Sequence, residues 1–203
     1  TPIGDLTINT GPAVALPAVT LASSKNLNLT SGVLTQSGIL TVPGTTTVTA
    51  GANAITLTNA GNDFTGAVSL SNSGTNDVSL TDVNALDLGT VSVGQNLTVT
   101  TGGALTDSGA ITVGSLATLV STGQSVTLGD STTANFGSLD FAGAAVSIKE
   151  GSSMEIAASE ATGVLTLEAS GAITQTGAID ADLASSFTAG ANAITLSLSL
   201  IHI

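Results

Sequence analysis

The chain has 203 residues and a formal net charge of −12, from 14 acidic residues against Lys25, Lys149 and no arginine. Because phosphate neutralisation needs clustered lysine and arginine, this balance argues against nucleic-acid binding. The absence of cysteine excludes disulfides, thiol catalysis and thiolate metal sites.

The remaining composition favours strands over helices. Charged residues make up 8% of the chain and hydrophobic residues 42%, and most of the polar residues are threonine, serine and asparagine. Threonine, valine and isoleucine fit pleated strands, whereas the residues that populate surface helices are scarce. No run of about 18 apolar residues occurs, so we expect no membrane-spanning helix. The composition predicts an all-β protein.

Short alternating strands recur along the whole chain in two interleaved series. The first series comprises residues 27–29, 47–49, 68–70, 86–88, 105, 126–128, 146–148, 165–167 and 187–188. The second comprises residues 19–21, 39–40, 55, 78–80, 97–99, 119, 139, 156, 173 and 194. Turn-forming residues separate the strands, among them Gly51, Gly74, Gly123 and Gly129. Two series with one spacing indicate that the chain coils.

The spacing sets the size of the coil. From Leu27 to Phe187 the first series takes eight steps over 160 residues, or about 20 residues a step. A coil of this size buries its apolar face only by stacking on its neighbours. We therefore expect a right-handed parallel β-helix of about ten coils, forming one continuous segment over residues 1–203. A pair of antiparallel sandwiches would favour Asn-Gly or Asp-Gly hairpin turns, and neither dipeptide occurs.

A longer repeat of about 70 residues lies on top of the coil spacing. Residues 31–57 and 170–196 align without a gap and are identical at 14 of 27 positions, and the segment TAGANAITL occurs verbatim at residues 49–57 and 188–196. A third copy covers residues 102–128. The unit would contain three to four coils. The sequence does not say whether the copies face one side of the rod.

These segments resemble the repeats of filamentous-haemagglutinin-like adhesins and other bacterial beta strand repeat surface proteins. The resemblance covers most of the chain and is clearest at residues 61–113 and in the 27-residue copies. It implies a right-handed β-helix shaft within a longer secreted protein that acts in adhesion or biofilm. We could match no secretion-signal motif, so the chain is interpreted as an internal piece of shaft. The resemblance supplies no binding residues.

Individual residues offer no catalytic or metal site. His202 is the sole histidine and has no second histidine or cysteine to partner it. Turn acids are the remaining candidates for a cation: Asp77, Asp82, Asp87, Asp180 and Asp182. The tandem calcium nonapeptide is absent, so we expect solvated turn acids, with weak calcium binding as the open alternative.

Two further readings of the surface are less favoured. Paired carboxylates suggest a β-helix glycosidase or lyase, but the chain has no tryptophan or tyrosine on which a sugar could stack. Thr-x-Thr at residues 47–49, 56–58 and 98–100 could bind ice, but it occurs in few coils and in no common register. We expect no enzyme, no catalytic or cofactor-binding residue and no cofactor.

The sequence thus predicts a structural protein. The first hypothesis is the shaft of a secreted bacterial cell-surface adhesin, a rigid spacer in adhesion or biofilm, located extracellularly and without membrane insertion. Its partners would be host or cell-surface glycans or proteins. The alternative is a subunit of a self-assembling extracellular filament or matrix fibre, joined head to tail through unpaired strand edges at the solenoid ends.

Overall fold

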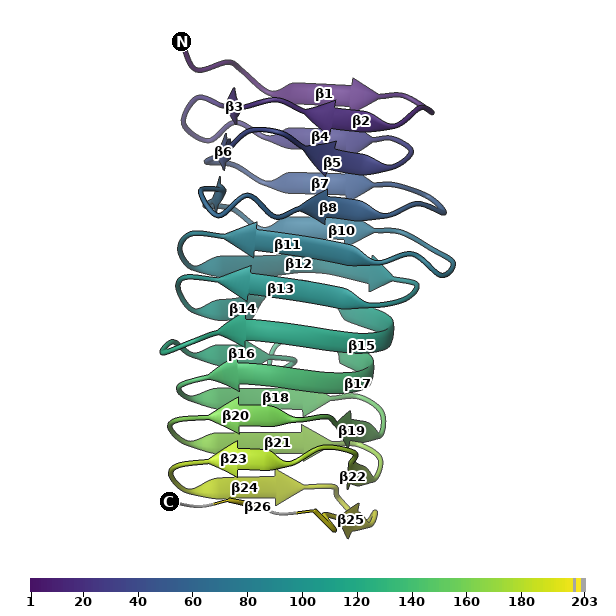
Figure 1. Cartoon of the computed structure of the whole chain (residues 1–203), viewed down its shortest axis with the longest axis vertical. Helices are drawn as coiled ribbons and strands as arrows, with labels where there is room; N and C mark the ends of the chain where they lie inside the picture. The colour runs from purple at the N-terminus through teal and green to yellow at the C-terminus, as the bar shows by residue number, and fades with distance from the viewer. Residues whose placement is uncertain (199, 202–203) are drawn as a thin grey trace.

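The computed structural model describes residues 1–198 and 200–201, and this part of the chain forms a right-handed solenoid of parallel strands without any helix (Figure 1). Strands of neighbouring coils pair in register about 20 residues apart. For example, Leu6 pairs with Leu27, and Leu27 pairs with Thr46. The prediction of an all-β solenoid with about ten coils is therefore confirmed.

Two long stacks of strands run down opposite sides of the rod. The back stack comprises β1 (Leu6–Asn9), β4 (Leu27–Thr30), β7 (Thr46–Thr49), β10 (Val68–Ser71), β12 (Leu86–Val93), β14 (Leu105–Asp107), β16 (Val126–Leu128), β18 (Val146–Glu150), β21 (Leu165–Ala169) and β24 (Ser185–Thr188). The front stack comprises β2 (Val14–Leu16), β5 (Leu34–Gln36), β8 (Ile55–Leu57), β11 (Val78–Asp82), β13 (Leu97–Thr101), the ends of β15 (Ile111–Ser121) and β17 (Ala134–Gly143), β20 (Ser159–Ala161), β23 (Ile179–Ala181) and β26 (Leu200–Ile201).

Short strands form a third side whose place changes along the rod. In the first coils it follows the front strand and comprises β3 (Val19–Thr20), β6 (Leu40–Val42) and β9 (Asp63–Phe64). In the middle coils it follows the back strand and comprises the end of β12 and the starts of β15 and β17. In the last coils it comprises β19 (Met154–Ile156), β22 (Ile173–Gln175) and β25 (Ile194–Thr195).

Alternation along each strand builds one core through the stack. In β4, Leu27 and Leu29 point inward and are buried, whereas Asn28 and Thr30 are exposed. The same alternation recurs from coil to coil, and the buried residues form a single cluster from Leu16 to Ala189. Burying each such aliphatic side chain contributes about 1.5–3 kcal/mol, which a single coil cannot gain alone.

The 70-residue copies lie on alternating sides of the rod. Equivalent strands are β7 in the back stack, the end of β15 in the front stack and β24 in the back stack again. From β7 the chain passes through β8, β10, β11, β12, β13 and β14 before it reaches the end of β15, which makes seven half-coils. The step from β15 to β24 also takes seven half-coils, through β16, β17, β18, β20, β21 and β23. One repeat therefore spans three and a half coils, and the middle copy faces away from the other two.

The verbatim segments fold alike. Gly51 and Gly190 both take a left-handed backbone, with φ of 55° and 57°, which glycine adopts without a steric penalty. The side-chain amides of Asn53 and Asn192 then donate to the carbonyl oxygens of Ala50 and Ala189 at 2.8 and 3.1 Å. The repeated sequence thus encodes a repeated turn.

Two details of the sequence interpretation are wrong. The second series mixes two sides: residues 19–20, 40, 156, 173 and 194 belong to the short strands, whereas residues 78–80, 97–99, 119 and 139 belong to the front stack. Ile39 lies just before β6 and is 46% exposed, whereas Leu40 in β6 is fully buried. The alternating apolar pattern of segment 194–203 predicts a single strand, but β25 ends at Thr195 and β26 begins at Leu200; residues 199, 202 and 203 lie outside the described residues.

Candidate functional site: repeat junctions and solenoid faces

A buried carboxylate lies at the end of the first set of short strands, next to β9. Phe64 lies in β9, the last of the short strands β3, β6 and β9, and is fully buried. Its backbone N–H points toward the next coil, where this set of short strands has ended. Asp82, the last residue of β11, accepts this N–H through Oδ1 at 2.9 Å. Asp82 is 2% exposed, and its Oδ2 has no hydrogen-bond partner. We call this pair the first junction.

A second pair repeats the arrangement, with its carboxylate 68 residues and its phenylalanine 72 residues farther along the chain. The backbone N–H of Phe136, at the start of β17, donates to Glu150 Oε1 at 3.0 Å. Glu150 is the last residue of β18 and is 1% exposed. Ser152 Oγ donates to the same carboxylate at 2.8 Å. We call this pair the second junction.

The two carboxylates occupy the same place in successive repeats. Each is the fifth residue of its strand, in VSLTD and in VSIKE, and alternation directs positions one, three and five inward. An apolar residue at position five would leave the phenylalanine N–H unpaired in the core, which costs about 1–3 kcal/mol. In the first coil the equivalent residue is Thr10, which directly follows β1 and is half-buried.

Burial shifts the acidity of both groups. Burial, with a further contribution from the neighbouring Asp63 carboxylate, raises the pKa of Asp82 to about 6, although the N–H of Phe64 opposes the shift. Burial also raises the pKa of Glu150 above its ordinary value, and the Phe136 N–H and the Ser152 hydroxyl oppose it. Position 135, which corresponds to Asp63, is the neutral Asn135.

Other buried polar side chains serve the backbone in the same way. Asp107 accepts the N–H of Gly129 at 2.9 Å and a hydrogen bond from the Thr132 hydroxyl. Asn62 accepts the N–H of Leu40 at 3.0 Å, one coil above the first junction. These side chains stand where the strand ladder is interrupted, so their role in the fold is to satisfy buried donors.

Hydroxyl and amide side chains form continuous rows on the outer faces, with one side chain from each coil at directly paired positions. We call these rows files. One file on the back stack and the adjoining short strands runs through Asn9, Thr30, Thr49, Ser71, Ser92, Thr112 and Asn135. A file on the front stack runs through Thr56, Ser79, Thr98, Thr118 and Asp140. The prediction that the Thr-x-Thr segments share no register is therefore wrong for Thr56 and Thr98. Both lie in the same file, with Ser79 of the intervening coil between them. Thr47–Thr49 lies on the other stack.

Charge is unevenly spread along the rod. Residues 1–62 carry only Asp5 and Lys25, whose side chains pair at 3.6 Å. The backbone N–H of Asn26, helped by Lys25, lowers the pKa of Asp5. Farther along, Glu160 and Asp180 occupy directly paired positions on neighbouring coils. The last coils therefore present a negative front face.

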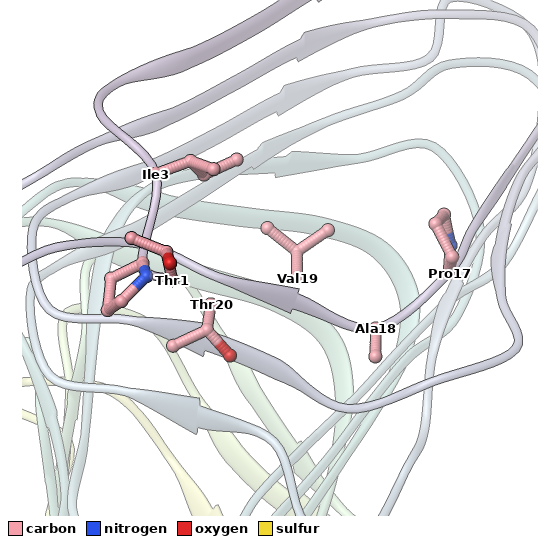
Figure 2. Close-up of a pocket in the computed structure, with 7 residues that line it drawn as sticks. Thr1, Ile3, Pro17, Ala18, Val19 and Thr20 are labelled. Carbon is pink, nitrogen blue, oxygen red and sulfur yellow. The ribbon is translucent and has the colours of Figure 1, made fainter.

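The upper end of the rod holds a shallow groove of about 540 Å³ between residues 1–3 and 17–20. Figure 2 shows Ile3 and Val19 on the inner side of β3, whereas Ala18 and Thr20 project to the other side. The backbone of Ile3 bonds to Thr20 and Ala22 at 3.0 and 2.7 Å. The groove offers apolar surface and threonine hydroxyls but no acid or base.

The predicted turn acids have diverse surroundings. Asp77 Oδ1 accepts the backbone and side-chain N–H groups of Asn96, and Asp87 Oδ2 accepts the Ser108 hydroxyl at 2.7 Å. Asp180 lies in β23 and Asp182 is exposed beside it. Within residues 1–198 and 200–201 no three acidic or histidine side chains are grouped to hold a metal ion. His202 lies outside the described residues.

The sequence interpretation was wrong about Asp82 and missed two buried acids. The sequence predicts a solvated turn at Asp82, but this residue is buried in a strand. Asp87 and Asp180 also lie in strands rather than in turns, and both are half-buried. No role is assigned to Glu150 or Asp107 from the sequence. Strand alternation in the sequence indicates that Asp82 and Glu150 are buried. In VSLTD and VSIKE the acid at position five shares the inward face with the apolar residues at positions one and three.

Comparison with known proteins identifies repeats of one family. A family model described as repeats of unknown function (DUF5649) matches residues 3–71, 75–141 and 143–199. Searches of curated proteins and of solved structures found no match. The second and third matched segments begin just before β11 and β18, the strands that carry Asp82 and Glu150. The described residues include no helix able to cross a membrane.

Proposed function

We propose that this chain, which belongs to the DUF5649 family of repeats, is part of the rigid shaft of a secreted bacterial surface adhesin. The observation that carries the proposal is the uninterrupted stack: both strand ladders and one core continue through all the described coils. The resemblance to filamentous-haemagglutinin-like repeats adds the extracellular location. The proposal assigns no catalytic role and no cofactor.

The stack supports a mechanical role. Each interior strand is paired with the coil above and the coil below, so bending the rod would break several ladder bonds and expose core at once. At a spacing of about 4.8 Å, ten coils extend about 48 Å. A longer array of the same repeats would hold a distal binding tip far from the cell surface.

The outer files support weak lateral contacts. The back file from Asn9 to Asn135 presents a hydroxyl or an amide from every coil that it crosses, at one coil spacing. Single hydrogen bonds to glycans or proteins would be weak, but a row of them binds with an avidity that grows with the number of contacts. The net negative charge keeps parallel rods apart.

Electron microscopy of the purified chain and of the native material tests the proposal. A shaft predicts isolated short rods from the purified chain and, in native material, one rod that continues within a single polypeptide. Uniform fibres at low concentration would contradict it. Melting with and without a calcium chelator serves as a control, since weak calcium binding by turn acids would lower the melting temperature on chelation.

One observation is compatible with the alternative, a subunit of a head-to-tail filament. Leu6 and Ile8 in the first coil are half-buried, whereas their register partners Leu27 and Leu29 are at most 2% exposed. One further coil would bury them, whether it comes from the same polypeptide or from a second copy.

A charge placed at this end distinguishes the two origins. Ile8→Lys would prevent fibres that grow by end-to-end stacking, because it buries an unpaired charge at the joint. Val83→Lys, at a position that is 51% exposed, is the matched control and should leave such fibres unchanged. Fibres unaffected by Ile8→Lys would exclude stacking through this end.

A further inference from the structure

The two junctions place ionisable groups at the boundaries between repeats. Asp82 and Glu150 are almost completely buried. Asp82 accepts the backbone N–H of Phe64, and Glu150 accepts that of Phe136. Neither forms an ion pair in the described structure. A charged carboxylate that is buried without a cation is unfavourable, and its neutral form is favoured in its place.

The surroundings of Asp82 contain no compensating charge. The charged group that acts on it is Asp63 of β9, which has the same sign. Thr101, its partner in β13 below, is neutral, as is Asn84 in the following turn. Its Oδ2 has no hydrogen-bond partner and can carry a proton while Oδ1 continues to accept the Phe64 N–H. The backbone N–H groups of Asn84 and Val83 lower the pKa of Asp82, but burial outweighs them.

Glu150 is likewise surrounded by neutral groups. Ala134 lies above it in register and Ala169 below, and Ser152 donates to it from the following turn. The adjacent Lys149 has an exposed side chain that pairs with Glu168 at 3.7 Å. No cation therefore faces either carboxylate within the described residues.

We propose that the repeat junctions are acid-tightened joints: as the pH falls, each buried carboxylate takes up a proton while it is still within the fold, and the repeats become more firmly attached to each other. The neutral acid keeps its carbonyl oxygen as the acceptor for the phenylalanine N–H, so the hydrogen bond survives protonation. The burial cost of the charge disappears, and at the first junction so does the repulsion between Asp82 and Asp63.

The sign of the effect follows from linkage. The pKa of Asp82 is about 6 in the fold against an ordinary 3.8, so the folded chain binds more protons than the unfolded chain between these values. The stabilisation is complete below the ordinary value and is lost as the pH rises through about 6. Between pH 7.5 and pH 5, Asp82 alone should shift the opening equilibrium of the first junction about tenfold toward the closed state.

Hydrogen exchange of backbone amides measures this opening locally. After correction for intrinsic exchange chemistry, the Phe64 amide should be protected about tenfold more at pH 5 than at pH 7.5. Asp82→Asn keeps an acceptor oxygen without the charge, so it should be well protected at pH 7.5 and should lose this pH dependence. Glu150→Gln should likewise keep an acceptor for the Phe136 N–H and remove any pH dependence that the Glu150 carboxylate gives to the protection of this amide. Asp130→Asn removes an exposed turn acid and is the matched control.

The carboxyl ¹³C shift of Asp82 in the unmodified chain provides a test that does not depend on the variants folding. A titration midpoint near 6 is expected. A midpoint at or below the ordinary value of 3.8 would overturn the proposal for the first junction. Equal pH dependence in Asp82→Asn and the unmodified chain, or its loss in Asp130→Asn, would overturn it as well.

Discussion

The first and second junctions share a backbone arrangement and differ in the polar atoms around the acid. Asp82 accepts the Phe64 N–H, has one oxygen without a hydrogen-bond partner and faces the acidic Asp63, while the backbone N–H groups of Asn84 and Val83 lower its pKa. Glu150 receives both the Phe136 N–H and the Ser152 hydroxyl, and Asn135 stands where the first junction has Asp63. The comparison teaches that burial raises the pKa of both acids, whereas the hydrogen bonds and neighbouring charges that modify this effect differ between the two junctions.

Removing the aromatic ring should have the largest effect on either junction. Phe64→Ala and Phe136→Ala should each destabilise the chain by about 3–5 kcal/mol, since they leave a large cavity in the core. Phe64 is completely buried and Phe136 is 5% exposed, so the first substitution should cost more. Denaturant unfolding of the two variants measures the difference. A loss below 1 kcal/mol for Phe64→Ala would show that the first junction is not part of the cooperative core.

The glycines that follow the two phenylalanines should come next. A Cβ on Gly66 would lie 2.4 Å from the carbonyl oxygen of Gly44, and one on Gly137 would lie 2.7 Å from that of Ser115. Both contacts are with backbone of the coil above, so each alanine substitution should cost about 1–3 kcal/mol, with Gly66→Ala the larger. Gly11→Ala, where the Cβ would meet nothing within 4 Å, is the control for thermal melting.

Ser152→Ala should make the second junction behave more like the first. The hydroxyl donates to the carboxylate and favours its ionised form, so its loss should raise the pKa of Glu150 further. The cost should be about 1 kcal/mol at neutral pH and smaller in acid, where Glu150 is protonated. Unfolding curves between pH 4 and pH 8 test this. A cost that is the same at every pH would show that the hydroxyl does not act through the charge.

Asp63→Asn should make the first junction behave more like the second, with the smallest change in stability. Removing the neighbouring negative charge should lower the pKa of Asp82 below about 6, although burial would still hold it above 3.8. The window in which stability falls with rising pH should therefore move down. Asp77→Asn, in an exposed turn, is the matched control. The carboxyl titration of Asp82 measures the shift, and an unchanged midpoint would show that Asp63 contributes nothing.

The sequence predicted the coil well and the junctions poorly. Alternation at Leu27 and Leu29, repeated about every 20 residues, was sufficient because the buried face of a strand must recur at the coil spacing. The alternation does not predict whether the short strands follow the front strand or the back strand of a coil, because this depends on where each coil bends. Asp82 was misplaced because aspartate is common in turns, and only the inward direction of Val78 and Leu80 shows that it is buried.

The odd number of half-coils in a repeat has a consequence for partners on the two flanks of the rod. A patch encoded in one repeat faces one flank, and its copy in the next repeat faces the opposite flank about 17 Å farther along, at the usual strand spacing. An array of such repeats is therefore double-sided. A single kind of repeat therefore presents the same set of exposed side chains to both flanks, at alternating heights along the rod.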